Sequence, residues 1–189
     1  MARTAGRWGR GAGAVVLAGA VTLAGAAFGP APGAAGATTC STPWGSGAKT
    51  ATTTSALTTT GVRAGRHACF DRIVVDGASW AKVRYVSQVV MDGSGEVVPL
   101  RGGARLQVLT TTGVDPSTGT PTFLPTGARR TDVVAVGGFR TLRQVAWAGD
   151  FEGQLTLGVG VRSRLPVRTF VVRTPGKPPK VVVDVAHRW

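Results

Sequence analysis

The sequence predicts an all-β domain, a β-sandwich of short, mainly antiparallel strands, with no long helix after the N-terminal segment. Apolar residues alternate with polar ones in several short stretches, which is the pattern of strands with one buried face. Turn-forming residues separate these stretches at short intervals, as they do in sandwiches and barrels. No stretch after the N-terminal segment shows a sustained 3.6-residue apolar period.

Residues 1–37 are expected to be a cleaved export signal. Three arginines precede an uncharged stretch rich in Ala, Val, Leu and Gly, and residues 35–37 supply the small side chains that cleavage requires. Glycines interrupt the stretch and prolines follow it, so a retained membrane-spanning helix is the weaker interpretation. The mature chain is therefore expected to be secreted, extracellular or associated with the cell wall, without a transmembrane segment.

The mature chain is expected to form one strongly basic domain. Removing residues 1–37 takes away three arginines and no acid, which leaves 19 basic and 9 acidic residues and a net charge of +10. The remaining length of about 150 residues suits a single hydrophobic core.

Cys40 and Cys69 are the two cysteines of the chain, and in an oxidising compartment they predict one disulfide. Lipid anchoring at Cys40 is the less favoured alternative, because the bacterial lipobox has a bulky aliphatic residue where this sequence has Ala37. The disulfide would tie a Thr/Gly-rich leader, residues 38–61, to the first strong strand. The low hydrophobicity of the leader predicts a loop or an edge strand, with an O-glycosylated stalk as a weaker alternative.

The strands are predicted from two kinds of pattern. Runs rich in β-branched residues, too short for a stable helix, lie at 70–76 and 133–136. Alternation marks the stretches 81–89, 155–161 and 181–185. Turn signals lie between them, namely Asp92-Gly93-Ser94-Gly95, Gly102-Gly103, Asp115-Pro116-Ser117, Gly137-Gly138 and Pro175-Gly176.

Three blocks of the mature sequence resemble a known family. They are CSTPWGSG (40–47) with GRHACFDRIV (65–74), VVMDGSGEVVPLRGGARL (89–106), and FRTLRQVAWAGDFEG (139–153) with VVVDVAHRW (181–189). Together they resemble the AMIN-like domain of secreted and lipid-anchored actinobacterial proteins, which would occupy residues 62–189.

The resemblance implies a β-sandwich with a role at the cell envelope. The related AMIN module positions cell-wall amidases and secretin-type proteins and binds peptidoglycan-associated surfaces. The parts most similar to AMIN itself are the strand 72–76 and the ending formed by 168–172 and 181–185. No amidase domain accompanies them in this sequence, so a localisation role would be exercised alone or in trans. The resemblance carries over no catalytic residue.

No residue set predicts catalysis, a metal or a cofactor. His67, Cys69 and Asp71 alternate along one strand, but a disulfide at Cys69 leaves two donors where structural zinc takes four. A serine triad is not indicated, because no serine lies in a Gly-x-Ser-x-Gly motif. Two acid pairs lie in Gly-rich turns, where acids usually cap the backbone: Asp92 with Glu96, and Asp150 with Glu152. The chain is therefore predicted not to be an enzyme.

The basic excess is the property that points to a partner. Arginine makes bidentate contacts to phosphate and carboxylate. Five arginines late in the sequence are the candidate anion-binding residues: Arg140, Arg143, Arg162, Arg164 and Arg168. Four of them, Arg140, Arg143, Arg162 and Arg168, are expected to face solvent because they alternate with apolar residues, and adjacent strands could bring several of the five onto one face. The expected partner is a cell-wall polymer, peptidoglycan or teichoic acid, and not nucleic acid, which an exported protein rarely meets.

Two functions follow from these observations. The first is a secreted non-catalytic module that binds or localises to the cell envelope. The alternative is a secreted protein-binding module such as a protease inhibitor, for which the rigid exposed loop would lie at 112–125 or 175–180. A hydrolase is less favoured than either.

Overall fold

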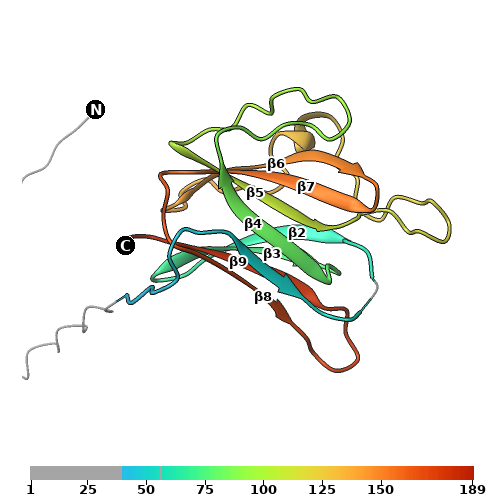
Figure 1. Cartoon of the computed structure of the whole chain (residues 1–189), viewed down its shortest axis with the longest axis horizontal. Coiled ribbons are helices and arrows are strands. Elements are labelled where there is room, and N and C mark those ends of the chain that lie inside the picture. Colours follow the sequence, from blue (N-terminus) through green and yellow to red (C-terminus); the bar gives the residue numbers. More distant parts are fainter. Residues whose placement is uncertain (1–39, 56) are drawn as a thin grey trace, which may run out of the picture. The chain divides into compact units, whose positions relative to one another are not determined.

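Nine antiparallel strands form two sheets that pack face to face in this computed structural model, which describes residues 40–55 and 57–189 (Figure 1). The first sheet has the order β1 (Lys49–Thr52), β4 (Trp80–Val86), β5 (Ala104–Thr111), β7 (Gln154–Val161), β6 (Leu142–Phe151). The second has the order β2 (Gly61–Arg66), β3 (Phe70–Asp76), β9 (Lys180–Ala186), β8 (Val167–Val172). Within the described residues the one helical element is the short 3₁₀ helix η1 (Gly127–Arg130). The predicted all-β sandwich is confirmed, while the export signal predicted for residues 1–37 lies outside the described residues.

The core lies between the sheets and is built from the alternating positions of the strands. In β4, Val83 is fully buried while Lys82 and Arg84 are exposed, as the sequence pattern predicts. The largest fully buried side chains of this core come from both sheets: Ile73, Leu106, Leu142, Leu155, Leu157, Val75, Val83, Val108, Val145, Val159 and Val161. Each contributes roughly 1.5–3 kcal/mol by leaving water, so this two-sided alternation is the main source of stability.

Strand β7 departs from simple alternation because both of its faces are buried. Thr156, Gly158 and Gly160 are as inaccessible as the apolar residues between them. The loop between β4 and β5 lies over the outer side of this sheet and forms a second small core with β6 (Figure 1). A Cβ at Gly158 would press on Val89 and Leu100 of that loop. The glycines of β7 are therefore the positions at which the loop approaches the sheet most closely.

The leader is part of the sandwich. Strand β1 pairs with β4 from Lys49↔Val83 to Thr52↔Trp80 and forms an edge of the first sheet, so the prediction of a loop or edge strand is confirmed. Thr59 is fully buried and donates from Oγ1 to the carbonyl oxygen of Thr111 at 2.6 Å. A solvated, glycosylated stalk does not fit this packing.

One predicted strand is wrong. Residues 133–136 form no strand, although Val133 and Val136 are buried in the core. The Val133 N–H donates to the carbonyl oxygen of Val145 at 2.8 Å, but the chain then bends away through Gly137 and Gly138. These residues form a loop whose buried valines cover the end of the core, and they do not extend the sheet.

The outer face of the second sheet is covered by side chains of the sheet itself. Asp184 on β9 is fully buried between Arg72, which contacts both carboxylate oxygens at 2.7 and 2.9 Å, and Arg168, at 2.8 Å. The two guanidinium groups in turn stack on Phe70 and Phe170 at 5.1–5.5 Å from the ring centroids. This arginine–aromatic layer shields the outer face of β9 from water.

Candidate functional site

Three strand ends meet at one end of the sandwich and bring arginines together there. Arg140 precedes β6, Arg162 follows β7, and His187 with Arg188 follows β9. The Arg162 N–H donates to the Thr141 carbonyl oxygen at 2.8 Å, and Thr141 Oγ1 donates to the carbonyl oxygen of Ala186 at 3.1 Å. The first contact joins the ends of β7 and β6 within one sheet, and the second joins that sheet to the end of β9 in the other, so the three segments are fixed relative to one another.

A buried histidine–aspartate pair forms the floor of this region. The Nε2 of His187 lies 3.0 Å from Oδ1 of Asp71, and its Nδ1 lies 3.2 Å from the carbonyl oxygen of Ala68. The other oxygen of Asp71 accepts from the backbone N–H groups of Thr141 and Leu142 at 2.5 and 3.1 Å. Both ring nitrogens thus face oxygen atoms of the protein.

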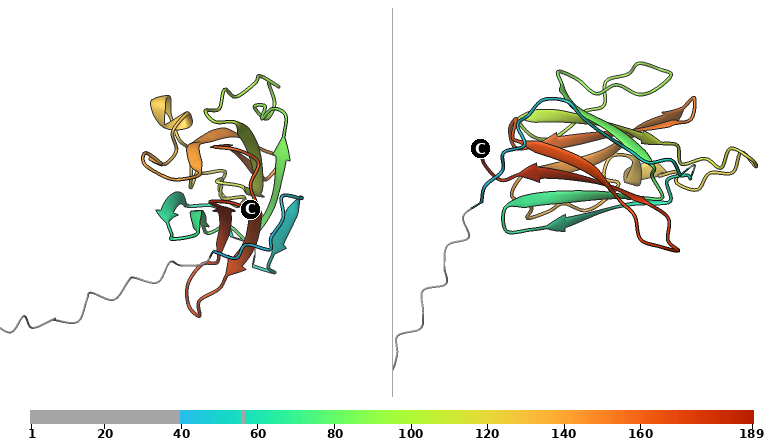
Figure 2. Two further views of the ribbon diagram at one scale, coloured as in Figure 1. Left: turned by 90° about the vertical axis from the view of Figure 1, so that its left-hand side faces the viewer. Right: turned by 60° about the horizontal axis from the view of Figure 1, so that its bottom comes forward.

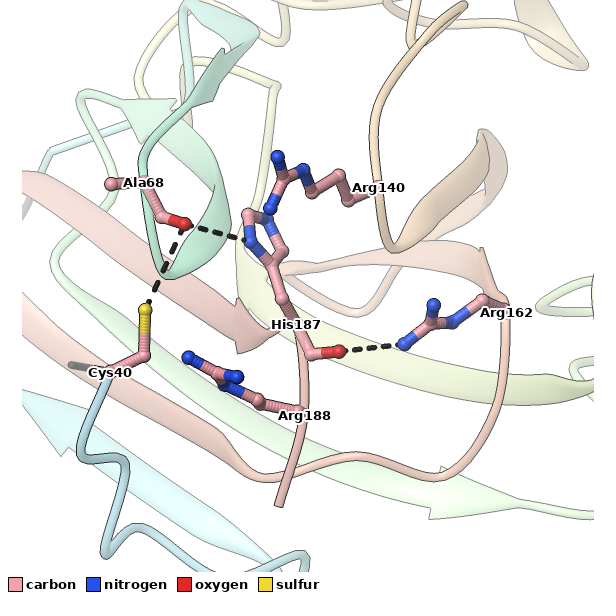
Figure 3. A pocket seen from close by; sticks show the side chains of 6 residues that line it. All are labelled: Cys40, Ala68, Arg140, Arg162, His187 and Arg188. Carbon is pink, nitrogen blue, oxygen red and sulfur yellow. Dashed lines mark hydrogen bonds between the residues drawn. The ribbon is translucent and has the colours of Figure 1, made fainter. Parts of the chain in front are cut away.

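Above this floor lies a pocket of about 520 Å³, which we call the basic pocket. It is lined by Cys40, Ala68, Arg140, Arg162, His187 and Arg188 (Figure 3). Arg162 donates from Nη2 to the carbonyl oxygen of His187 at 2.6 Å. Within residues 40–55 and 57–189, no side-chain hydrogen bond or ion pair engages the guanidinium groups of Arg140 and Arg188. The pocket lining contains cationic side chains and no acid, so its chemistry suits an anion.

The structure brings together two of the five arginines predicted from the sequence, Arg140 and Arg162. Arg143 is half-buried and donates to three backbone carbonyl oxygens of residues 139–142. Arg164 donates to Ser46 Oγ at 3.1 Å and stacks over Tyr85. Arg168 belongs to the arginine–aromatic layer. The expectation that these side chains face solvent together does not hold for Arg143 and Arg168, because strand alternation does not show which carbonyl or carboxylate lies beside an arginine.

Arg188 is a member of the pocket that the sequence reasoning missed. It follows the last strand and lies next to the C-terminal Trp189, outside any alternating pattern. The one sequence signal for it is a basic residue directly after a histidine at a strand end, and that signal is weak. The convergence of three strand ends is a property of the sheet topology.

The segment 40–47 places Cys40 in the lining of the pocket and is held there by the predicted disulfide. Cys40 is bonded to Cys69, with their Cα atoms 5.3 Å apart. Thr42 Oγ1 donates to the carbonyl oxygen of Arg188 at 3.2 Å, and the ring of Trp44 stacks on the guanidinium group of Arg168 at 4.2 Å. The disulfide prediction is confirmed, and a sulfur in this bond cannot carry a thioether-linked lipid.

The other candidate residues for chemistry do not form a site together. His67 stacks on Phe70 with ring centroids 4.5 Å apart, whereas Asp71 faces His187. In the part of the chain that the structure describes, no group of three or more His, Cys, Asp or Glu side chains could hold a metal. Asp150 caps the backbone, because its carboxylate accepts from Thr112 Oγ1 and the Gly113 N–H at 2.7 and 2.6 Å.

No helix among the described residues is sufficiently long and apolar to span a membrane.

Comparison with known proteins places the sandwich and most of the pocket in one family. The family model of the AMIN-like domain matches residues 57–187, a range that contains β2 to β9 together with Arg140, Arg162 and His187. No curated protein and no solved structure matches the chain.

Proposed function

The chain belongs to the AMIN-like domain family, whose presence suggests a cell-envelope-associated module, and we propose that it is a secreted, non-catalytic module that binds an anionic polymer of the cell wall through the basic pocket. The observation that carries this proposal is the set of three guanidinium groups around one pocket without an acidic side chain in its lining.

The charges of the pocket support an anionic ligand. Like charges held close together raise the free energy of the folded state. Four other arginines are compensated by carboxylates: Arg72 and Arg168 by Asp184, Arg63 by Asp76 and Arg101 by Asp132. Arg140 and Arg188 lack such compensation among the described residues, and a bound anion would supply it.

The geometry of His187 supports a binding role over a catalytic one. A histidine that acts as a general base needs a free nitrogen within hydrogen-bond reach of the proton it removes. Both nitrogens of His187 face protein acceptors, Asp71 and Ala68. Its imidazole positions the strand ends that carry the arginines.

A second candidate function, a protein-binding module such as a protease inhibitor, is favoured by the loop after β5. This loop projects beyond the end of the sandwich (Figure 2). It is stiffened by a bridge between Val114 and Pro121 and by Asp115, whose carboxylate accepts from the N–H and the hydroxyl of Ser117 at 2.9 and 2.7 Å. A rigid exposed loop of this kind is what a protease would engage.

Sedimentation with isolated bacterial cell walls tests the first proposal. We expect the wild-type domain to co-sediment and the variant R140E/R162E/R188E to remain in solution. The matched control is R129E/R173E/K177E, which makes the same change in net charge at exposed positions outside the basic pocket and should sediment like the wild type. Circular dichroism verifies that all three proteins are folded.

Two outcomes would contradict the proposal. Equal retention of the wild type and R140E/R162E/R188E would show that the cell wall does not bind in the basic pocket. Absence of retention for the wild type, with capture of a secreted protease by the immobilised domain, would favour the protein-binding alternative, and deletion of residues 116–119 should then abolish that capture.

A further inference from the structure

The basic pocket has the features of a site for a tetrahedral anion. Resting on the function proposed above, we infer that it binds the phosphate group of a phosphodiester wall polymer in preference to the carboxylates of peptidoglycan. The inference follows from the direction and the number of the groups in the pocket.

The three guanidinium groups enter the pocket from different segments and lie around His187 (Figure 3). A carboxylate has two oxygens in one plane, and a single guanidinium group can saturate most of its acceptor sites. The oxygens of a phosphate point in tetrahedral directions, so guanidinium groups from several sides can share them. Donors that approach from three segments therefore match a phosphate better than a carboxylate.

The protein itself shows how it satisfies a carboxylate. Asp184 is bound by Arg72 through two hydrogen bonds and by Arg168 through a third, and the group is then fully buried. Two guanidinium groups suffice there. The basic pocket offers a third, and Arg162 commits only Nη2 to the protein, through the carbonyl oxygen of His187.

The charge of the pocket favours an anion but does not choose between the two. Asp71, which contacts the floor residue His187, is fully buried, and its oxygens already face His187 and two backbone N–H groups. A phosphodiester and a carboxylate each carry a charge of −1, so the preference for phosphate rests on the direction and the number of the guanidinium groups.

The first test uses inorganic phosphate and acetate as probes at matched ionic strength. Millimolar phosphate should raise the melting temperature of the wild-type domain in a saturable manner, and acetate should not. Because phosphate also stabilises proteins without binding, the shift is compared with that of R140Q/R188Q, which should lose the saturable part, and of R129Q/R173Q, which should keep it. Equal shifts for both anions, or for wild type and R140Q/R188Q, would overturn the inference.

The second test separates this inference from the function on which it rests. Retention is measured on native walls and on walls from which phosphodiester-linked polymers have been stripped with hydrofluoric acid. Loss of retention on stripped walls supports phosphate recognition. Equal, pocket-dependent retention on both would preserve the proposed function and overturn the inference. Pocket-dependent binding to phosphatidylglycerol vesicles and not to walls would support phosphate recognition, assign it to a lipid headgroup and contradict the wall proposal.

Discussion

At the scale of single residues, two groups of arginines differ in a way that composition cannot show. Arg72 and Arg168 hold a buried carboxylate and stack on aromatic rings, and their charge is used inside the fold. Arg140 and Arg188 contact no acid in the described residues. The sequence supports the idea of an anion site, but only the structure shows which arginines remain available for a ligand.

The substitution Asp184→Asn tests the first group. It leaves two guanidinium groups beside a neutral amide, and removing one partner of a buried charge cluster typically costs about 3 kcal/mol. Asp76→Asn is the matched control on the same face, because Arg63, its partner at 2.7 Å, is 55% exposed and an exposed pair contributes about 1 kcal/mol or less. Urea unfolding of both variants measures the two losses, and equal losses would contradict the structural role of Asp184.

Asp92 provides a pH-dependent test. Burial raises the pKa of Asp92 above its ordinary value of 3.8, and the negative charge of Asp150 adds to the rise. The folded state therefore binds this proton more tightly than the unfolded chain does, so the stability that this proton contributes is lost as the pH rises from 3.8 through the raised pKa. We expect Asp92→Asn to be more stable than the wild type at neutral pH and to lose this advantage below 3.8.

The control for Asp92 is Asp115, whose substitution should act with the opposite sign. Hydrogen bonds from the hydroxyl and the N–H of Ser117 lower the pKa of Asp115, so its ionised form stabilises the fold above the ordinary value of 3.8. Asp115→Asn should destabilise the protein at neutral pH, by a small amount because the group is exposed. Urea unfolding at two pH values measures both variants, and a shift of the same sign for both would show that the assigned environments are wrong.

At the scale of elements, the sequence predicts the strands that show apolar alternation or a β-branched run. It misses a strand whose formation depends on pairing with its neighbour. Strands β3, β4 and β9 follow from alternation or β-branched runs. Strand β2 reads GVRAGR, has only Val62 and Ala64 as its apolar face, and is paired along its whole length with β3, from Gly61↔Asp76 to Arg66↔Asp71. The run 133–136 has buried valines and begins beside the edge strand β6, but after the hydrogen bond from Val133 to Val145 the chain bends away and no ladder forms.

The cover of β7 by the loop between β4 and β5 leads to a prediction at Gly160. A Cβ at this position would collide with the carbonyl oxygen of Arg101, so Gly160→Ala must push the loop away from the sheet. We expect a loss of about 1–3 kcal/mol, the usual cost of overpacking. Gly47→Ala is the control, because nothing lies within 4 Å of a Cβ there and the φ angle is not positive. Thermal unfolding distinguishes them, and a neutral Gly160→Ala would disprove the close approach.

The disulfide between Cys40 and Cys69 also leads to a testable prediction. Cys40 and Cys69 are 29 residues apart, and closing a loop of that length contributes about 3–4 kcal/mol in the chain-entropy model. The double variant Cys40→Ser/Cys69→Ser should lose stability of this order and release residue 40 from the lining of the basic pocket. Mass spectrometry of the unreduced wild type should show no free thiol, whereas two free thiols would refute the pairing.

At the scale of the whole molecule, residues 38–189 contain 19 basic and 9 acidic residues, a net charge of +10. A general excess of charge and a specific site differ in how they attract an anion. A general excess attracts polyanions through every exposed arginine and lysine, and salt screens it over about 10 Å at 0.1 M. A specific site concentrates contact on a few groups. The basic pocket is formed at three strand ends that lie far apart in the sequence. Composition therefore indicates an anionic partner but not the place where it would bind.

The most direct measurement of the central claim is an NMR titration that follows the arginine Nε–Hε signals while a soluble fragment of wall polymer is added at physiological salt. The account predicts saturable shifts confined to Arg140, Arg162 and Arg188, with the His187 ring signals following and Arg129 and Arg173 unchanged. Small, unsaturated shifts spread over all exposed arginines, or shifts centred on the loop after β5, would contradict a binding site in the basic pocket.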